Sequence, residues 1–231
     1  HTSYGIGGPV LCLFYPANEK DLSIILNLSE KRSIPIFFAG SGSNLLVSDE
    51  GFQGFVINLS KTFKTIEIDG NNVFSECGVM MGHFVKKCVG AGLTGVESLV
   101  GVPGTLGGAI RMNAGAYGRE ISNFLTELKV MTLDGDMKRI QRNEVEFGYR
   151  HSSLRADEIV ISARFKFEKG TREEIHELKS KASHSRKTTQ PLRFRSAGSV
   201  FKNPAEKAAG QLIDQAGLKG TRVGGAEISE K

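Results

Sequence analysis

Glycine density is the feature that most constrains this chain. Eleven of its 28 glycines fall between Gly78 and Gly118, although the whole chain has 231 residues. The glycines do not recur at a fixed period, which excludes a collagen-like chain. Glycine adopts backbone conformations that other residues avoid and lets another molecule approach the main chain closely. The segment therefore predicts backbone held close to a ligand.

The overall composition is that of a globular protein, with 39% hydrophobic and 24% charged residues. The length allows one large domain or two small ones. No apolar run approaches the roughly 18 residues that span a bilayer, and the first residues do not resemble a signal peptide. Three cysteines, an odd number without a CxxC pair, indicate free thiols in a reducing cytoplasm. We expect a cytoplasmic protein without a membrane partner, truncated at both ends because it lacks an initiator Met and a terminating element.

The positive charge is concentrated in one stretch. The formal net charge is +5, and residues 164–195 contain ten Lys or Arg and four Glu, a local net charge of +6. This stretch carries the whole excess, so it predicts a local anionic partner rather than a generally basic surface.

Hydrophobic spacing and capping signals predict an α+β fold. We expect helices over residues 18–32, 81–89, 171–187 and 203–217. Strands are expected over 34–39, 55–59 and 159–167, in a hairpin over 66–77, and on both sides of Asp134 and Gly135.

Two glycine-rich segments are candidate ligand sites. Gly40–Asn44 follows a predicted buried strand, and its small residues can present several N–H groups to one anion. Taken alone, a five-residue segment of this kind is more often a tight turn. The longer segment over residues 101–118 can line a large dinucleotide. It is too apolar for a flexible linker, so here ligand binding is favoured.

Several familiar motifs are excluded by their context. Gly90, Gly92 and Gly95 match GxGxxG, but they follow a helix and no acidic residue stands about 20 residues later. No P-loop is present. The five histidines lack metal-ligand spacing, so no zinc or iron site is predicted.

Two further polar motifs carry candidate chemistry. Ser199 and Lys202 match SxxK, but Pro204 makes the helix that this nucleophile motif requires improbable. The polar run over residues 149–153 contains Arg150, whose guanidinium can hold a carboxylate with two hydrogen bonds. A solvated loop is the alternative for this run.

Six segments, in order along the chain, resemble the UDP-N-acetylenolpyruvoylglucosamine reductase (MurB) family of peptidoglycan synthesis. One such motif is weak evidence, whereas six in the family's order are specific. The matching segments are residues 1–8, 40–48, 101–118, 149–153, 197–204 and 225–231.

The resemblance implies an FAD-binding fold of the vanillyl-alcohol-oxidase type. Two N-terminal α+β subdomains are expected over residues 1–62 and 63–168, followed by an incomplete substrate-binding domain over 169–231. It implies bound FAD, NADPH as co-substrate, and reduction of UDP-N-acetylglucosamine enolpyruvate to UDP-N-acetylmuramate. We expect a monomer without a nucleic-acid partner.

The resemblance also implies roles for individual residues. Arg150 matches the arginine that stabilises the enolate, and Ser199 matches the residue that protonates C2. A third catalytic residue, a glutamate, is implied in a segment that this sequence does not contain. Substrate contacts are expected from Tyr149, Gln190, Lys202 and Asn203, with Arg186 a further contact to flavin or substrate. Cofactor contacts are expected from Gly40, Ser41, Gly42, Ser43, Asn44, Leu45, Pro103, Gly104, Thr105, Gly107, Gly108, Asn113, Gly115, Ala116 and Val160.

Two alternatives stay open at this point. One is a flavin oxidase of the same fold, which has no reason to carry the proton-donor serine of the 197–204 motif. The other is a nucleic-acid-binding module using the basic stretch. It is disfavoured because the chain has no tryptophan and only 8% aromatic residues.

Overall fold

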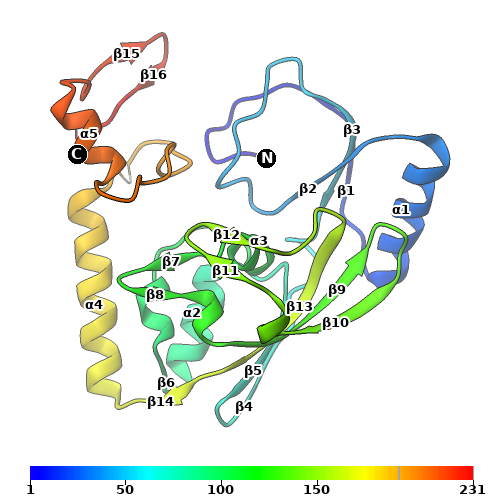
Figure 1. Cartoon of the computed structure of the whole chain (residues 1–231), viewed down its shortest axis with the longest axis horizontal. Coiled ribbons are helices and arrows are strands. Elements are labelled where there is room, and N and C mark those ends of the chain that lie inside the picture. The colour runs from blue at the N-terminus through cyan, green and yellow to red at the C-terminus, as the bar shows by residue number, and fades with distance from the viewer. Residues whose placement is uncertain (192, 231) are drawn as a thin grey trace.

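A computed structural model describes residues 1–191 and 193–230. Lys231, the last residue of the motif over 225–231, lies outside the described residues. The first layer is a parallel sheet of three strands in the order β1-β3-β2 (Figure 1). Its strands are β1 (Val10–Phe14), β2 (Ile36–Ala39) and β3 (Phe52–Asn58).

Helix α1 (Glu19–Arg32) connects β1 to β2. Asn18 caps it as predicted, because its side-chain oxygen accepts a hydrogen bond of 3.0 Å from the Asp21 N–H. Leu22 and Leu26 are fully buried on one face of the helix.

The N-terminal residues 1–8 run beside the segment that follows β2. The Ser3 N–H donates a hydrogen bond of 3.0 Å to the Gly42 carbonyl.

A five-stranded antiparallel sheet forms the second layer, in the order β10-β9-β13-β5-β4. Its inner face packs on α2 (Met81–Gly90), where the Phe84 and Phe165 rings lie 5.1 Å apart. One hydrophobic cluster joins α1, both sheets and α2. The strands are β4 (Ile66–Asp69), β5 (Asn72–Glu76), β9 (Leu125–Thr132), β10 (Met137–Gln141) and β13 (Glu158–Lys166).

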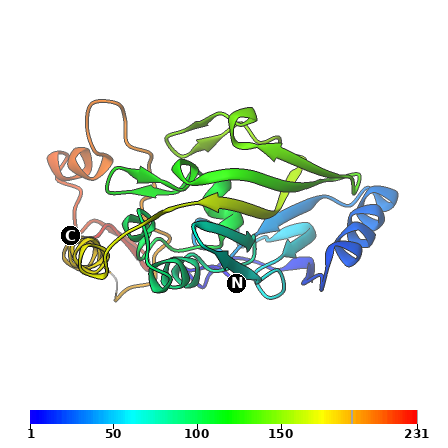
Figure 2. The same ribbon diagram turned by 90° about the horizontal axis from the view of Figure 1, so that it is seen from below.

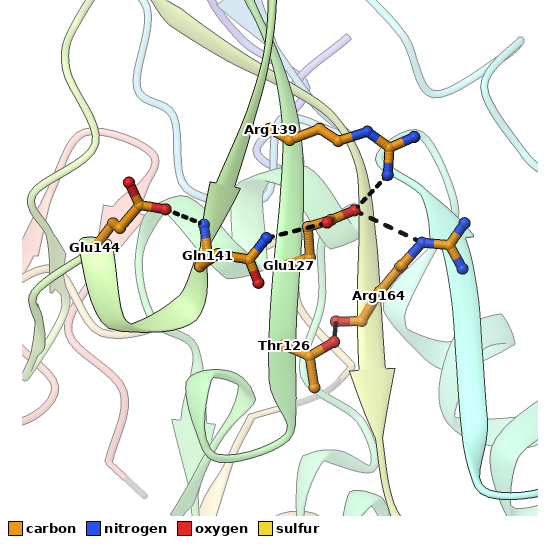
Figure 3. Close-up of polar contacts among 6 residues, drawn as sticks. All are labelled: Thr126, Glu127, Arg139, Gln141, Glu144 and Arg164. Carbon is orange, nitrogen blue, oxygen red and sulfur yellow. Dashed lines mark hydrogen bonds and ion pairs between the residues drawn. The ribbon is translucent and has the colours of Figure 1, made fainter.

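The outer face of this sheet is polar. The Glu127 carboxylate on β9 lies between Arg139 on β10, at 2.8 Å, and Arg164 on β13, at 3.7 Å (Figure 3). Gln141 donates a further hydrogen bond of 3.1 Å to the other carboxylate oxygen. The alternation of apolar and polar residues along these strands therefore separates a buried face from a solvated one.

Short elements connect the two layers and build the loops between them. They are β6 (Leu93–Thr94), η1 (Val96–Leu99), α3 (Leu106–Arg111), β7 (Gly115–Ala116), β8 (Arg119–Glu120), η2 (Ile121–Asn123), η3 (Arg142–Glu144), β11 (Phe147–Gly148), β12 (His151–Ser152) and β14 (Glu168–Lys169).

Helix α4 (Arg172–Thr189) lies at the end of the molecule opposite α1 (Figures 1 and 2). The predicted capping box is present, since Thr171 and Glu174 exchange side-chain and backbone hydrogen bonds. Two contacts dock α4 on the glycine-rich segment. The Tyr117 hydroxyl donates to the Ala182 carbonyl at 2.9 Å, and Arg186 donates to the Val100 carbonyl at 3.1 Å.

The last part of the chain comprises α5 (Ala209–Gln215), β15 (Arg222–Val223) and β16 (Ala226–Glu227). The predicted start of this helix at residues 203–204 is wrong, because α5 begins at Ala209. Asn203 instead reaches forward, and its side-chain oxygen accepts the Ala209 N–H at 3.0 Å. Among the described residues, no helix combines the length and the apolar character that crossing a membrane requires.

Candidate active site

The two glycine segments meet in the structure, as their predicted shared role requires. A Cβ atom on Gly40 would lie 2.5 Å from the Thr105 Oγ1, which is far closer than two such atoms can approach. A Cβ on Gly104 would lie 3.2 Å from the Ser43 Oγ. Gly104 also has a φ of 114°, a conformation that side chains disfavour. The approach of the segments therefore depends on the glycines.

Asn58 supports the first segment from the end of β3. It is buried, and its side-chain N–H donates a hydrogen bond of 2.8 Å to the Gly40 carbonyl. The sequence analysis missed this residue. The sequence does not single it out, because β3 also contains the amide side chain of Gln53, which is exposed.

Ser41 is the strongest sign that a ligand belongs between the segments. Its hydroxyl oxygen is buried and has no hydrogen-bond partner in the described part of the chain. Leaving a buried hydroxyl unpaired costs about 1–3 kcal/mol. A bound molecule with a polar group at this point would supply the missing partner. In the same segment Ser43 and Leu45 are half-buried and Asn44 is exposed.

The long glycine segment is more regular than predicted. Residues 106–111 form α3, a helix that is absent from the predicted elements. Tertiary contacts fix the helix, because the N–H groups of Leu106 and Gly107 donate to the carbonyls of Val79 and Cys77 at 2.8 and 2.9 Å. A Cβ on Gly107 would lie 3.0 Å from the Cys77 Cβ. The Gly107 N–H is therefore used in a hydrogen bond within the protein, and the absence of a side chain lets Gly107 pack closely on Cys77.

Asn113 supports the site from inside. Its side chain is fully buried and donates to the Glu120 carboxylate at 2.6 Å and to the Gly148 carbonyl at 3.0 Å. The Ser122 N–H donates to its side-chain oxygen at 3.4 Å. Both amide protons are thus used within the protein. Asn113 ties the β7–β8 hairpin, which carries Gly115 and Ala116, to the β11–β12 hairpin.

Tyr149 and Arg150 are the two turn residues between β11 and β12. Arg150 has a φ of 53°, a left-handed conformation that costs a residue with a side chain about 1–2 kcal/mol. Its guanidinium donates to the Gly115 carbonyl at 3.2 Å and lies over the Tyr149 ring, 5.0 Å from the centroid. Strained residues of this kind concentrate at functional sites.

The segment carrying Ser199, Lys202 and Asn203 reaches this turn. The Asn203 backbone N–H donates to the Tyr149 hydroxyl at 3.4 Å. Ser199 and Lys202 are exposed. Earlier in the sequence, Arg195 lies against Gly5. A Cβ added to Gly5 would lie 2.0 Å from a nitrogen of the Arg195 guanidinium. The structure therefore brings one predicted substrate residue, Asn203, to another, Tyr149, and leaves the Ser199 side chain in solvent.

Gln190 and Arg186 lie together at the end of α4. The Arg186 Nε donates to the Gln190 side-chain oxygen at 2.9 Å, while its other nitrogen holds the Val100 carbonyl. Burial lowers the pKa of the Arg186 guanidinium below its ordinary value. Val160, another predicted cofactor residue, is a buried member of the hydrophobic core on β13.

Two surface concavities lie away from this arrangement. One, of about 580 Å³, is bordered by His83, Lys86 and Lys87 of α2, and one of about 420 Å³ lies on α4. Each is lined mainly by long side chains of a single helix and lacks an unpaired buried group. We place the site at the glycine segments because the unpaired Ser41 hydroxyl, the close approach and the strained Arg150 all lie there. No three His, Cys, Asp or Glu side chains of the described chain gather to hold a metal ion.

Comparison with known proteins decides the family. A model described as the FAD binding domain matches residues 10–141, and the model for the UDP-N-acetylenolpyruvoylglucosamine reductase C-terminal domain matches residues 190–231. The reductase of Streptococcus uberis is 43% identical over 232 residues, covering 100% of this chain and 76% of the relative. The chain belongs to the UDP-N-acetylenolpyruvoylglucosamine reductase family.

Further members of the reductase family agree. The reductase of Prochlorococcus marinus is 42% identical, covering 99% of this chain and 79% of its own. The crystal structure of the Thermus caldophilus reductase superposes with a TM-score of 0.87 at 36% identity, covering 99% of this chain and 81% of that one. The family and the FAD-binding α+β fold expected from the sequence are therefore confirmed.

A more distant likeness concerns the fold alone. The wild-type glucose dehydrogenase Phl p 4.0202 has a TM-score of 0.50 and 12% identity, and the match covers 69% of this chain and 35% of the dehydrogenase chain.

The residues of this chain fit an FAD site on their own evidence. The paired glycine segments form a close-fitting cradle, and the Ser41 hydroxyl offers an unused polar contact inside it.

Proposed function

We propose that this protein holds FAD between the two glycine segments and reduces UDP-N-acetylglucosamine enolpyruvate to UDP-N-acetylmuramate, with NADPH as hydride donor. The observation that carries the proposal is the buried, unpaired Ser41 hydroxyl at the point where Gly40 meets Thr105. When bound, FAD accepts a hydride from NADPH and delivers one to C3 of the enolpyruvyl group.

Arg150 would stabilise the charge that this transfer creates. Hydride addition at C3 leaves negative charge on C2 and the adjoining carboxylate. The guanidinium can bind a carboxylate with two parallel hydrogen bonds. Its contact with the Gly115 carbonyl uses one nitrogen, which leaves further N–H donors for the enolate.

Ser199 would supply the proton to C2. A serine hydroxyl is a weak acid, but a carbanion-like C2 is a strong base, so the transfer is favourable once the two meet. Because the Ser199 side chain is exposed, the 193–208 segment must close over the substrate for this step. Lys202, Asn203, Gln190 and Tyr149 would bind the sugar nucleotide, whose diphosphate suits the basic 164–195 stretch.

We propose that the protein is a monomer and that it acts in the cytoplasm. The three cysteines are free, which suits a reducing compartment. The proposed substrates, NADPH and a nucleotide sugar, are also molecules of that compartment. In this setting the reaction belongs to peptidoglycan precursor synthesis.

An absorption spectrum tests the proposal directly. The purified protein, supplied with FAD, should show flavin bands that bleach with NADPH in the absence of oxygen. Adding the enolpyruvyl sugar nucleotide should restore them. A protein that stays colourless with added FAD would overturn the proposal, and so would reduced flavin that ignores the sugar nucleotide but reacts rapidly with oxygen.

A further inference from the structure

The side chain of Tyr149 makes two contacts that lead in opposite directions. Its ring lies beneath the Arg150 guanidinium, with 5.0 Å between the guanidinium carbon and the ring centroid. Its hydroxyl accepts the backbone N–H of Asn203 at 3.4 Å. Tyr149 is 49% exposed, so the surrounding protein covers about half of it. These two contacts contribute to its orientation.

We propose that Tyr149 is a positioning residue that orients Arg150 and couples this orientation to the arrival of the 199–204 segment. The inference rests on the proposed function, in which Arg150 and Ser199 serve the same reacting group. It assigns the tyrosine a role in arranging the site, in addition to the substrate contact expected from the sequence.

The local backbone explains why such support is needed. Arg150 lies in a two-residue turn, and within the described part of the chain its guanidinium donates one hydrogen bond, to the Gly115 carbonyl. One hydrogen bond lets a guanidinium rotate about that bond, whereas a ring below its plane adds a second constraint. The ring and the carbonyl together therefore define how the guanidinium faces the site.

The hydroxyl contact extends this arrangement along the chain. Asn203 follows Ser199 by four residues, and its side chain caps the first N–H of α5. Because four residues span at most about 14 Å, a segment held at Asn203 limits the distance between Ser199 and the Arg150 turn. The tyrosine therefore links the two residues that the proposed mechanism uses together.

Two substitutions separate the contacts. Tyr149→Phe keeps the ring and removes the hydroxyl, whereas Tyr149→Leu removes both. In flavin-loaded protein, Y149F should lower the limiting rate of flavin reoxidation by the sugar nucleotide by roughly 2- to 10-fold, the range that one hydrogen bond contributes, because the segment carrying Ser199 loses its contact with the turn. Y149L should also lower that limiting rate, by roughly 2- to 30-fold. Flavin reduction by NADPH should be unchanged in both.

Amide hydrogen exchange gives a readout independent of activity. The Asn203 amide should exchange faster in Y149F, by roughly 2- to 10-fold, because its acceptor is gone. Phe74→Leu is the matched control. It removes another arginine–ring contact, in which Arg164 lies 5.4 Å from the Phe74 centroid on the outer face of the sheet. It should change neither the kinetics nor the exchange of Asn203.

The outcomes separate this inference from the proposed function. If Arg150→Lys loses the substrate half-reaction while Y149L keeps the wild-type limiting rate, the positioning role of Tyr149 is overturned and the function stands. Unchanged exchange of the Asn203 amide in Y149F would overturn the coupling to the 199–204 segment. If Arg150→Lys itself retains the wild-type rate, the role of Arg150 in the proposed function fails.

Discussion

Gly40 and Thr105 meet across the site, since a Cβ on Gly40 would fall 2.5 Å from the Thr105 Oγ1. The two residues are 65 positions apart in the sequence. Gly40 continues β2 of the parallel sheet, and Thr105 precedes α3. Their contact brings the two glycine segments together beside Ser41, whose hydroxyl is buried.

Gly40→Ala should weaken FAD binding by roughly 10-fold or more. The added methyl group pushes the segments apart, and overpacking of this kind costs about 1–3 kcal/mol. Fluorescence titration of FAD measures the effect. Gly82→Ala is the control, because an added Cβ there meets nothing within 4 Å and lies in helix α2. It should bind FAD normally and unfold at slightly higher urea, and equal FAD affinity in both variants would contradict the close-contact argument.

Asn113→Ala should lower the free energy of unfolding by about 1–3 kcal/mol or more. It leaves the half-buried Glu120 carboxylate and the Gly148 carbonyl without their shared donor. Asn113 also has a φ of 42°, so Asn113→Gly separates the lost hydrogen bonds from backbone strain. Asn27→Ala, on the exposed face of α1, should change stability by less than about 0.5 kcal/mol. Urea unfolding compares the three, and an Asn113→Ala curve matching Asn27→Ala would show that the internal support is unimportant.

Much of the fold could be predicted because its signals are local. Asn18, together with the Thr171 and Glu174 capping box, marks helix starts by side chains that bond the adjacent backbone. The β4–β5 hairpin follows from its turn residues. By contrast, α3 contains Gly107 and Gly108, which are poor helix formers, and hydrogen bonds that its first N–H groups donate to the Cys77 and Val79 carbonyls determine its start. A window along the sequence does not contain these contacts.

The site can likewise be divided into features with a local sequence signal and features that depend on long-range contacts. Its glycine segments and the Tyr149–Arg150 motif could be recognised as residues, but their geometry arises from contacts between distant parts of the chain. The β11–β12 hairpin has two residues in each strand, too few for a periodic pattern. The left-handed Arg150, the Asn58 support for Gly40 and the docking of Arg186 on Val100 are therefore visible only in the folded structure.

Arg150→Lys should leave flavin reduction by NADPH intact and slow the substrate half-reaction by roughly 100-fold or more. A lysine ammonium keeps the charge but cannot reproduce the planar pair of donors that a carboxylate accepts. Stopped-flow absorbance at the flavin band follows the two half-reactions separately. Near-normal reoxidation by the sugar nucleotide would exclude a guanidinium contact with the enolate.

Ser199→Ala should slow the substrate half-reaction by roughly 100-fold or more, the contribution typical of a general acid. Ser196→Ala is the matched control, since Ser196 lies in the same exposed segment and its hydroxyl accepts the Gly198 N–H. That variant should keep its activity. If both half-reactions fall equally in Ser199→Ala, the residue supports the structure and does not donate the proton.

The thiols provide a test of the packing beneath the glycine segment. Burial raises the pKa of the Cys88 thiol to about 12, and burial together with the nearby Glu76 carboxylate raises the pKa of the Cys77 thiol far above its ordinary value. Both are therefore uncharged at pH 8, whereas thiol reagents attack the thiolate. Cys12, which is half-buried, is the one cysteine we expect to react in the native protein.

An aromatic disulfide reagent at pH 8 should accordingly modify about one thiol rapidly, and three after unfolding in urea. Cys12→Ser should remove the rapid phase. Gly107 packs on Cys77, so the reagent can reach Cys77 only when α3 moves away from it. The rate at which Cys77 is modified therefore measures this opening, and bound FAD should lower that rate. Rapid modification of Cys77 that FAD does not affect would mean that α3 leaves its site freely, which is incompatible with a cradle preformed for the cofactor.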